Sequence, residues 1–395
     1  MSRSGELQNK AIAYSLLQMI LYFLKLGTIG FGGPVALTGY MYRDLVEKRG
    51  WISESDYKDG LALAQLAPGP LAAQLAIYLG YVHYRIIGAT LVSIAFVAPS
   101  FLMVLALGWA YVQFGGITGM QAVFYAVGAS VIGIIAFSAY KLTTKTIGKD
   151  WLLWTIFVVA GSITVLTETE NVMLFLASGM LYWLVKAPPK NLWRKMNKFH
   201  GFVPFPATLL LTSEQSRNTG VLMDIFLYFL KAGAFVFGSG LAIVPFLYGG
   251  VVKEFGWLNS QQFLDAVAVA MITPGPVVIT TGFIGYLVSG FTGATVAALA
   301  TFLPCYLLTI LPAPLFKKYG KLPGINAFVN GVTAAATGAI SGAVIVLGKR
   351  SIIDFPTSLL AIITLGILWK SKKVSEPIII LASSIIGLII YPMTH

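Results

Sequence analysis

The sequence that decides the fold reads FLKLGTIGFGGPVALTGYMYRDLVEKRGWISESDYKDGLALAQLAPGP over residues 23–70. It returns without a gap as FLKAGAFVFGSGLAIVPFLYGGVVKEFGWLNSQQFLDAVAVAMITPGP over residues 229–276, at a constant offset of 206 residues. After a slip of one residue the offset becomes 205, and the register continues as far as Gly133 and Gly338. A duplicated apolar chain with helix-breaking motifs at matching places in both halves is typical of secondary transporters.

The composition is that of a membrane protein. Hydrophobic residues make up 57% of the chain and charged residues only 11%, and the mean hydropathy is +0.81. Soluble domains carry about a quarter charged residues, so this chain lacks the polar surface that water requires. Uncharged runs over 86–111, 120–140 and 325–347 are each long enough to cross a bilayer. The sequence therefore predicts an all-α polytopic membrane protein surrounded by lipid.

Cofactor and metal chemistry find no support in the sequence. The single Cys305 excludes intrachain disulfides and thiolate clusters, and the three histidines at 83, 200 and 395 have no ligand spacing. The sequence has no phosphate-binding loop of the Gly-x-x-x-x-Gly-Lys-Ser/Thr type. Basic cytoplasmic loops explain the net charge of +12 better than nucleic acid does. We therefore expect no cofactor, no metal, no nucleic-acid partner and no enzymatic activity.

The repeat predicts three parts. Residues 1–186 form an N-terminal transmembrane repeat, residues 187–220 a basic, proline-containing cytoplasmic linker, and residues 221–395 a C-terminal transmembrane repeat. In each repeat two short apolar segments flank a Pro-Gly-Pro motif, as 57–67 and 71–83 do in the first. Such segments are too short for a hydrocarbon core of about 30 Å, so we expect each motif to form a re-entrant helical hairpin with its tip near mid-membrane.

About five full crossings are expected in each repeat besides the hairpin, the first of them over 14–31. An odd number of crossings makes the two repeats inverted. The basic loops at 141–149 and 317–321 then lie inside, and the uncharged loop at 112–118 lies outside. This topology places Lys349 and Arg350 outside as exceptions, and also the N-terminus, which its Arg3 and Lys10 do not favour.

The two Pro-Gly-Pro motifs carry the strongest functional signal. Proline removes a backbone donor and disfavours helix in the residue before it, so each motif ends one helix and begins another. The new helix presents free N–H groups and a partial positive charge, which hold an anion without a full cationic side chain. A proline kink that merely shapes packing is the alternative, and two motifs at equivalent positions favour function over it.

The candidate substrate-binding residues belong to the helix breaks, to polar side chains near them and to two lysines in apolar helices. They are Gly32, Gly33, Gln65, Pro68, Gly69, Pro70, Gln74, Gly238, Ser239, Gly240, Thr273, Pro274, Gly275, Pro276, Thr280, Lys25 and Lys231. For the glycines, close helix packing is the competing interpretation. For the lysines, snorkelling to the membrane interface weighs equally with a functional role.

Two further groups of charged residues have open interpretations. Asp59 and Asp265 either accept coupling protons or cap the first hairpin arms, and capping is favoured. The cluster of Arg43, Asp44, Glu47 and Arg49 is either a solvated cytoplasmic face or an entry patch for anions.

The pattern Phe-Leu-Lys-x-Gly-x-x-x-Phe-Gly-Gly-Pro, then Gly-Trp, then Ala-x-x-x-Pro-Gly-Pro resembles the chromate ion transporter family in its long, two-domain form, over nearly the whole chain. The resemblance implies export of chromate across the bacterial inner membrane, chromate resistance, use of the proton motive force, and sulfate as a mimic of the substrate. The second repeat departs from the pattern with Gly-Ser-Gly at 238–240, which puts equal roles of the two repeats in doubt. An anion channel, a transporter of sulfate or another oxyanion, and a homodimeric assembly stay open alternatives.

Overall fold

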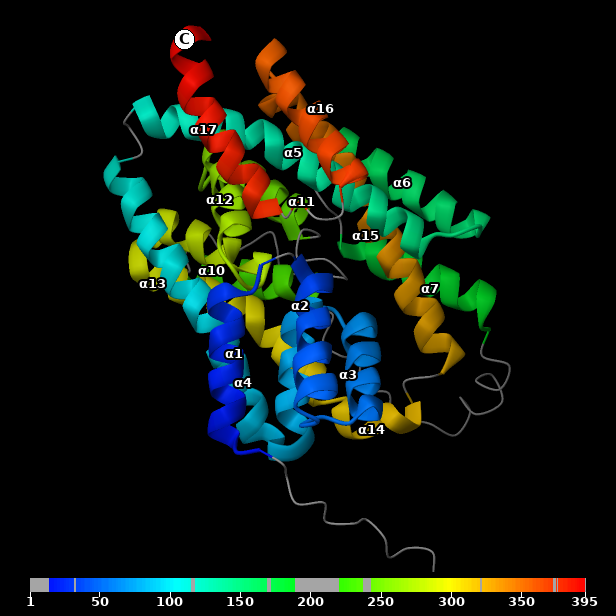
Figure 1. Ribbon diagram of the computed structural model, residues 1–395. Coiled ribbons are helices and arrows are strands. Elements are labelled where there is room, and N and C mark those ends of the chain that lie inside the picture. Colours follow the sequence, from blue (N-terminus) through cyan, green and yellow to red (C-terminus); the bar gives the residue numbers. More distant parts are fainter. Residues whose placement is uncertain are drawn as a thin grey trace, which may run out of the picture.

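The computed structural model describes residues 14–31, 33–114, 118–168, 172–188, 220–236, 243–319, 322–371, 374 and 376–394. Within these ranges the chain is helical almost throughout and contains no strand (Figure 1). The candidate residues Gly32, Gly238, Ser239 and Gly240, and most of the linker, lie outside the described residues.

The helices of the two repeats follow one another in matching order. The first repeat contains α1 (Leu16–Ile29), α2 (Gly33–Met41), the π-helical turn η1 (Tyr42–Lys48), α3 (Glu54–Leu66), α4 (Leu71–Phe114), α5 (Thr118–Thr146), α6 (Trp151–Thr167) and α7 (Val172–Lys186). The second contains α10 (Val221–Ala234), α11 (Ile243–Tyr248), the π-helical turn η4 (Gly249–Glu254), α12 (Ser260–Ile272), the 3₁₀ turn η5 (Val277–Ile279), α13 (Thr280–Ile310), α14 (Ala313–Tyr319), α15 (Pro323–Ser351), α16 (Phe355–Lys370) and α17 (Glu376–Thr394). The short helix α14 falls in a region that we predicted as a loop.

The long helix α4 is folded back on itself. Arg85 has φ 51° and ψ −141°, outside helical geometry. A Cβ atom on Gly80 would lie 2.6 Å from the carbonyl oxygen of Gly88. Eight residues of straight helix span about 12 Å, so the chain must reverse between these glycines. The inner arm, residues 71–84, and the outer arm, residues 86–114, match the predicted division of this region.

The second repeat makes the same turn in α13. Gly290, which is equivalent to Arg85 at the offset of 205, has φ 60° and ψ −149°. Gly285 and Gly293 then approach as closely as Gly80 and Gly88 do: a Cβ on Gly285 would lie 2.4 Å from the carbonyl oxygen of Gly293. The inner arm of α13 ends at this turn and the outer arm runs from there to Ile310. The two repeats therefore share their turns as well as their sequence.

The opening helix α1 differs from the predicted full crossing over 14–31. Ser15 and Gln18 form a capping box that begins the helix, and the chain breaks again at Gly30. Its 14 residues span about 21 Å, less than the hydrocarbon core. The ring of Tyr14, just before α1, stacks on Trp51 after η1 at 4.8 Å. The segment α2–η1 therefore returns to the end of the molecule from which α1 started.

Among the described residues, five helices are long and apolar enough to cross a membrane, instead of five in each repeat. The spans are Leu71–Phe114, Gly119–Thr146, Val277–Phe316, Pro323–Ser351 and Glu376–Met393. Their length and composition agree with a multi-pass membrane protein. The number is lower than predicted because the apolar helices α1, α6, α7 and α16 are shorter than 18 residues and because the folded helices α4 and α13 each count once. The parity of crossings therefore does not decide how the repeats are oriented.

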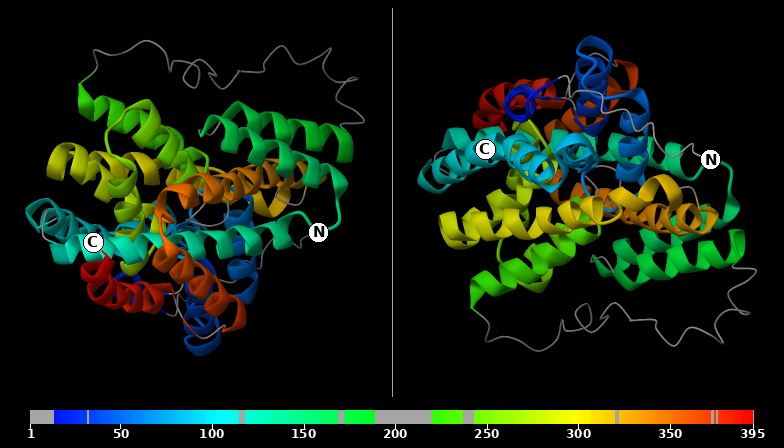
Figure 2. Two further views of the ribbon diagram at one scale, coloured as in Figure 1. Left: turned by 90° about the horizontal axis from the view of Figure 1, so that it is seen from above. Right: turned by 90° about the horizontal axis from the view of Figure 1, so that it is seen from below.

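The last helices of each repeat pack on the long helix of the other. The helices α6 and α7 lie against α15, and α16 and α17 lie against α5 (Figure 2). Small residues permit this close approach: a Cβ on Gly387 of α17 would lie 2.2 Å from the carbonyl oxygen of Ala122. Each repeat therefore completes the packing of the other.

The molecule has two ends that differ in charge. At the end where α1 starts, α3 packs on α14 (Figure 1). We call this the basic end, because η1 lies there with Arg43 and Lys48 and the sequence of α14 includes Lys317 and Lys318.

The opposite end carries one ionic cluster between the repeats. Glu168, after α6, accepts from Lys253 at 2.5 Å and from Arg350 at 2.7 Å, and the hydrogen bond from Lys253 lowers the pKa of Glu168. Arg350 also donates to Ser260 at the start of α12, at 2.9 Å. Arg350, one of the two exceptions in the predicted topology, is thus held by Glu168.

Candidate functional site

The two Pro-Gly-Pro loops meet the opposite repeats through reciprocal hydrogen bonds. The N–H of Gly69 donates to the carbonyl oxygen of Val236 at 2.5 Å, and the N–H of Gly275 donates to the carbonyl oxygen of Gly30 at 3.0 Å. Gly69 and Gly275 are equivalent in the repeat, as are Gly30 and Val236. Each loop therefore closes the open end of the first helix of the other repeat, whose last carbonyls have no partner within their own helix.

The outer arms of α4 and α13 pass beside these loops. Ser100 of α4 donates from Oγ to the carbonyl oxygen of Pro274 at 2.6 Å. Its repeat equivalent, Cys305 of α13, has its Sγ atom 3.1 Å from where a Cβ of Gly69 would lie. In the first loop, Nε2 of Gln74 donates a hydrogen bond to the carbonyl oxygen of Pro68 at 2.9 Å. The two loops therefore occupy equivalent positions, but different side chains form hydrogen bonds to them.

The outer arm of α4 runs antiparallel to the outer arm of α13. Phe101 lies 3.5 Å from where a Cβ of Gly282 would stand, and a Cβ on Gly108 would lie 2.9 Å from Tyr286. The residue numbers rise together along these contacts, so the outer arm of α4 runs parallel to the inner arm of α13. The outer arm of α13, which folds back at Gly290 and whose Tyr306 hydroxyl lies 2.5 Å from that of Thr90, therefore runs the opposite way. The hairpin α3–α4 and the hairpin α12–α13 consequently approach the region of Ser100 and Cys305 from opposite ends.

A small cavity of about 10 Å³ lies where the two loops meet. It is lined by residues from both repeats, namely Pro34, Leu37, Pro70, Ala72, Gly275, Pro276 and Val277. Three helical segments begin at this cavity: α2 at Gly33, α4 at Leu71, and η5, which leads into α13, at Val277. The volume holds about one water molecule, so a tetrahedral oxyanion enters only when the loops move apart.

Backbone N–H groups are the donors that the cavity offers. The first helical bond of α4 is from Gln74 N to Pro70 O, which leaves the N–H groups of Leu71 to Ala73 without helical acceptors. The first bond of η5 is from Ile279 N to Pro276 O, which likewise leaves those of Val277 and Val278. Helix starts carry a partial positive charge, so this arrangement attracts an anion.

The buried polar side chains support the loops rather than add free donors. Thr273 donates to Val269 O at 2.7 Å and Thr280 donates to Val277 O at 2.7 Å. Gln74, which is fully buried, donates from Nε2 to the carbonyl oxygens of Ala67 and Pro68. Its Oε1 has no partner among the described residues. These side chains hold the loops in shape, so the donors left at the cavity are backbone N–H groups.

The larger cavity of the described structure has a different character. It measures about 240 Å³ and lies between the outer arms of α4 and α13. Its walls are apolar, with side chains such as Ile94, Leu299 and Phe302. Such a surface offers no compensation for the lost hydration of a charged ligand. The small cavity between the loops is therefore the candidate anion site.

Comparison with known proteins supplies the family. A family model described as chromate transporter matches the chain twice, over residues 17–183 and residues 223–388. The chain belongs to the chromate transporter family. A chromate transport protein of Cupriavidus metallidurans is 67% identical over 385 residues, which cover 98% of this chain and 96% of that protein. A probable chromate transport protein of Synechococcus elongatus is 63% identical over 392 residues, covering 99% and 100%. No solved structure matches the chain.

Other candidate residues of this chromate transporter family member lie away from the cavity. Lys25 is on the exposed face of α1, Lys231 is half-buried on α10, and Gln65 is exposed on α3. None of the three lines the cavity between the loops. The structure thus separates the predicted lysines from the Pro-Gly-Pro loops.

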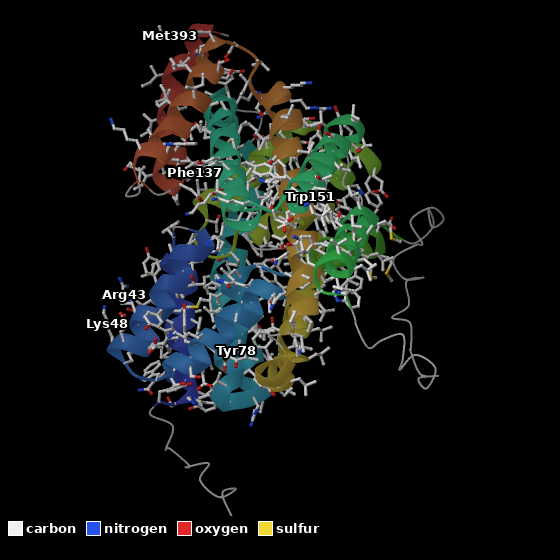
Figure 3. The ribbon with its side chains drawn as sticks, turned by 90° about the vertical axis from the view of Figure 1, so that its right-hand side faces the viewer. Arg43, Lys48, Tyr78, Phe137, Trp151 and Met393 are labelled. Carbon is white, nitrogen blue, oxygen red and sulfur yellow. The ribbon has the colours of Figure 1, made fainter. Side chains whose placement is uncertain are left out.

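The charged cluster of η1 lies at the basic end of the transporter. Arg43 pairs with Asp44 at 3.1 Å and Lys48 pairs with the same carboxylate at 3.5 Å. Glu47 is exposed, and the guanidinium of Arg49 lies over the ring of Trp51 at 4.4 Å. Figure 3 shows Arg43 and Lys48 at the outer edge of the molecule. As an entry patch, this cluster would act at the surface and not at the cavity.

The favoured capping interpretation of the two aspartates is wrong. Ser53 caps α3 and Asn259 caps α12, whereas Asp59 and Asp265 lie within these helices. Asp59 is half-buried, and Asp265 is only 3% exposed. The sequence did not indicate that Tyr111 bonds to Asp265, because Tyr111 belongs to the other repeat.

Proposed function

We propose that this protein is a secondary transporter that exports chromate across the bacterial inner membrane and thereby confers chromate resistance. The cavity between the two Pro-Gly-Pro loops carries the proposal, because three helix starts converge there and offer backbone donors to a dianion. The printed names of the relatives support chromate as the substrate. Sulfate, also a tetrahedral dianion, is the expected competitor.

The energetics agree with export without ATP. Moving one charge across 100 mV is worth about 2.3 kcal/mol, so a dianion leaving a negative-inside cell gains roughly twice that. Coupling to protons adds the pH gradient to this driving force. The cavity between the loops is closed to anything larger than about a water molecule, which favours a gated transporter over an open channel.

The test is radiolabelled chromate flux in proteoliposomes with imposed pH and voltage gradients. At zero voltage we expect an imposed pH gradient to drive chromate against its concentration gradient, and sulfate to compete. Flux that follows only the electrochemical gradient of chromate itself, whatever the pH gradient, identifies a channel. Sulfate flux without chromate flux identifies a transporter of another oxyanion.

We further infer that the two repeats are inverted in the membrane, with each Pro-Gly-Pro loop at the tip of a re-entrant hairpin. The antiparallel course of the outer arms and the reciprocal hydrogen bonds of Gly69 and Gly275 support this arrangement. The start of α1 lies at the basic end, so the positive-inside rule favours a cytoplasmic N-terminus. This differs from the external N-terminus that the count of crossings predicted.

Cysteine labelling checks this topology. In a background with Cys305 replaced, we expect an impermeant thiol reagent to label Gly116→Cys from outside and Lys321→Cys from inside. Ser4→Cys is expected to behave like Lys321→Cys, since α1 starts at the basic end. Labelling of Gly116→Cys and Lys321→Cys from one side would refute inversion, and external labelling of Ser4→Cys would refute the cytoplasmic N-terminus.

The two lysines are expected to act through charge at a distance. Lys25→Gln and Lys231→Gln should each lower chromate flux several-fold, because a charge still attracts a dianion where the effective dielectric is about 20 instead of 80. Arginine should be tolerated better than glutamine, and sulfate competition should weaken in parallel. The measurement is chromate efflux with sulfate as competitor.

A matched control for the lysine variants is Lys58→Gln. Lys58 is exposed at the basic end, and among the described residues its ion pair is with Glu54 of its own helix, at 2.6 Å. It should transport like the parent. If Lys25→Gln and Lys231→Gln do so too, both lysines are membrane-interface anchors.

A further inference from the structure

A buried carboxyl group lies near the start of the second hairpin, whose tip borders the candidate anion site, and has no cationic partner among the described residues. Asp265 accepts from the hydroxyl of Tyr111 through Oδ2 at 2.7 Å and from Nε2 of Gln261 through Oδ1 at 2.9 Å. Both donors are neutral, and within the described residues no ion pair involves Asp265. An ionised carboxylate in such surroundings costs several kcal/mol unless a cation pairs with it. The carboxyl group of Asp265 is therefore placed to take up and release a cation such as a proton.

We propose that Asp265 carries the coupling proton of transport and that the second repeat alone provides this function. The proposal rests on the proposed function of chromate export and deepens it by naming the residue that links the substrate to the pH gradient. Ionisable residues within a membrane are functional candidates by default, and proton relays are one of their recurring roles.

The link to the anion site runs through α4. The outer arm of α4 carries both Tyr111, which holds Asp265 near the start of the second hairpin, and Ser100, which holds Pro274 at its tip. Hydrogen bonds to a charged acceptor are about twice as strong as those between neutral groups. A proton on Asp265 therefore weakens the bond from Tyr111, a hydrogen bond that ties α4 to α12, and this hairpin must move for the cavity to open.

The first repeat lacks the parts for the same device. At the repeat offsets, Phe316 stands where Tyr111 would, and Ser55 stands where Gln261 would. A phenyl ring has no hydroxyl to donate. Asp59, the equivalent of Asp265, is half-buried and so remains partly hydrated. The difference gives the two halves unequal roles, as their different glycine breaks also suggested.

Other charged groups on the elements around α12 are few. They are Lys141 and Lys145 of α5, Glu376 of α17, Lys253 and Glu254 of η4, and Arg85 at the turn of α4. Lys253 is bound to Glu168. Tyr248 of α11 and Tyr286 of α13 are titratable side chains on these elements near the second hairpin, and Tyr248 bonds to Ser260. Of the acids, Glu254 is exposed and Glu376 is half-buried, and within the described residues Asp265 is the one that bonds to α4, so we place the proton on Asp265.

The experiment compares Asp265→Asn with Asp59→Asn in proteoliposomes. Asparagine keeps the size of the side chain but cannot take up a proton. We expect Asp265→Asn to lose chromate transport driven by a pH gradient, and the accompanying proton flux reported by an internal pH dye, at least about tenfold, whereas chromate exchange at equal pH and zero voltage stays within about twofold. Asp59→Asn should keep proton-driven transport.

If Asp265→Asn transports chromate under a pH gradient like the parent, Asp265 does not carry the coupling proton, although the protein still transports chromate. A parent protein that moves no chromate in either assay overturns the proposed function itself, and this assignment with it. A second variant, Tyr111→Phe, keeps the carboxyl group and removes one donor. It should shift the pH profile of transport, and an unchanged profile contradicts the role of the Tyr111–Asp265 bond even where Asp265→Asn fails to fold.

Discussion

Gly275→Val should abolish chromate transport while the protein still inserts and folds. Gly275 has φ +97°, a conformation that side chains with a Cβ rarely adopt, and its Cβ would lie 2.1 Å from the Oγ atom of Ser100. Strain of this kind amounts to about 1–3 kcal/mol before the contact with Ser100 is counted, which corresponds to a loss of about tenfold or more. The measurement is the initial rate of chromate flux per amount of folded protein.

Gly69→Val should also lower the rate of chromate transport, but by less than Gly275→Val does. Gly69 has φ +144°, but its Cβ would meet the amide group of Gln74 at 2.8 Å and the thiol of Cys305 at 3.1 Å, both of them side-chain atoms. These contacts are longer than the 2.1 Å contact of Gly275 with Ser100, so a smaller displacement relieves them. The variant with both glycines replaced should be inactive, since each loop binds the other repeat.

A control and a rescue make the test specific. Gly39→Val is the matched control, because a Cβ at Gly39 meets no atom within 4 Å. Ser100→Gly should partly restore a Gly275→Ala protein, because it removes the atom that a new Cβ would strike, and a double-mutant cycle measures this coupling. Normal flux by the protein with valine at both 69 and 275 would disprove the loops as the anion site.

The second large effect is expected on stability. Gly27→Ala and Gly233→Ala should each destabilise the folded protein, because the new Cβ atoms would lie 2.3 Å from the carbonyl oxygen of Phe96 and 2.2 Å from that of Thr301. These are backbone atoms of α4 and α13, so only a shift of whole helices relieves the contact. Overpacking typically costs about 1–3 kcal/mol, a large share of a net stability of about 5–15 kcal/mol.

Thermal unfolding in detergent checks this prediction. Both variants should unfold at lower temperature than the parent and give less folded protein. Gly128→Ala and Gly366→Ala serve as controls, since a Cβ at either position meets no atom within 4 Å. If Gly27→Ala and Gly233→Ala unfold at the same temperature as these controls, the close crossing of α1 on α4 and of α10 on α13 is not as described.

The sequence by itself determined the features that depend on local chemistry and on the repeat. Apolar runs without charge predicted the helices, and proline and glycine predicted where they break, because both residues act on the backbone at their own position. The breaks at Pro68 and Pro274 were predicted in this way, and the division of α4 at Arg85 was predicted from the uncharged run that begins at residue 86. The internal offset predicted that both halves would contain the same elements.

Only the tertiary structure decided which groups meet. Gly69 bonds to Val236 and Gly275 to Gly30, across more than 160 residues of chain, and no local pattern encodes such partners. The same holds for Tyr111 and Asp265, which lie 154 residues apart. Spacing placed Asp265 near a helix start and suggested a cap, but Asn259 takes that role because its backbone is extended and its side chain reaches the N–H of Gln262. The exchange of partners between repeats is a property of packing, and packing depends on all the helices at once.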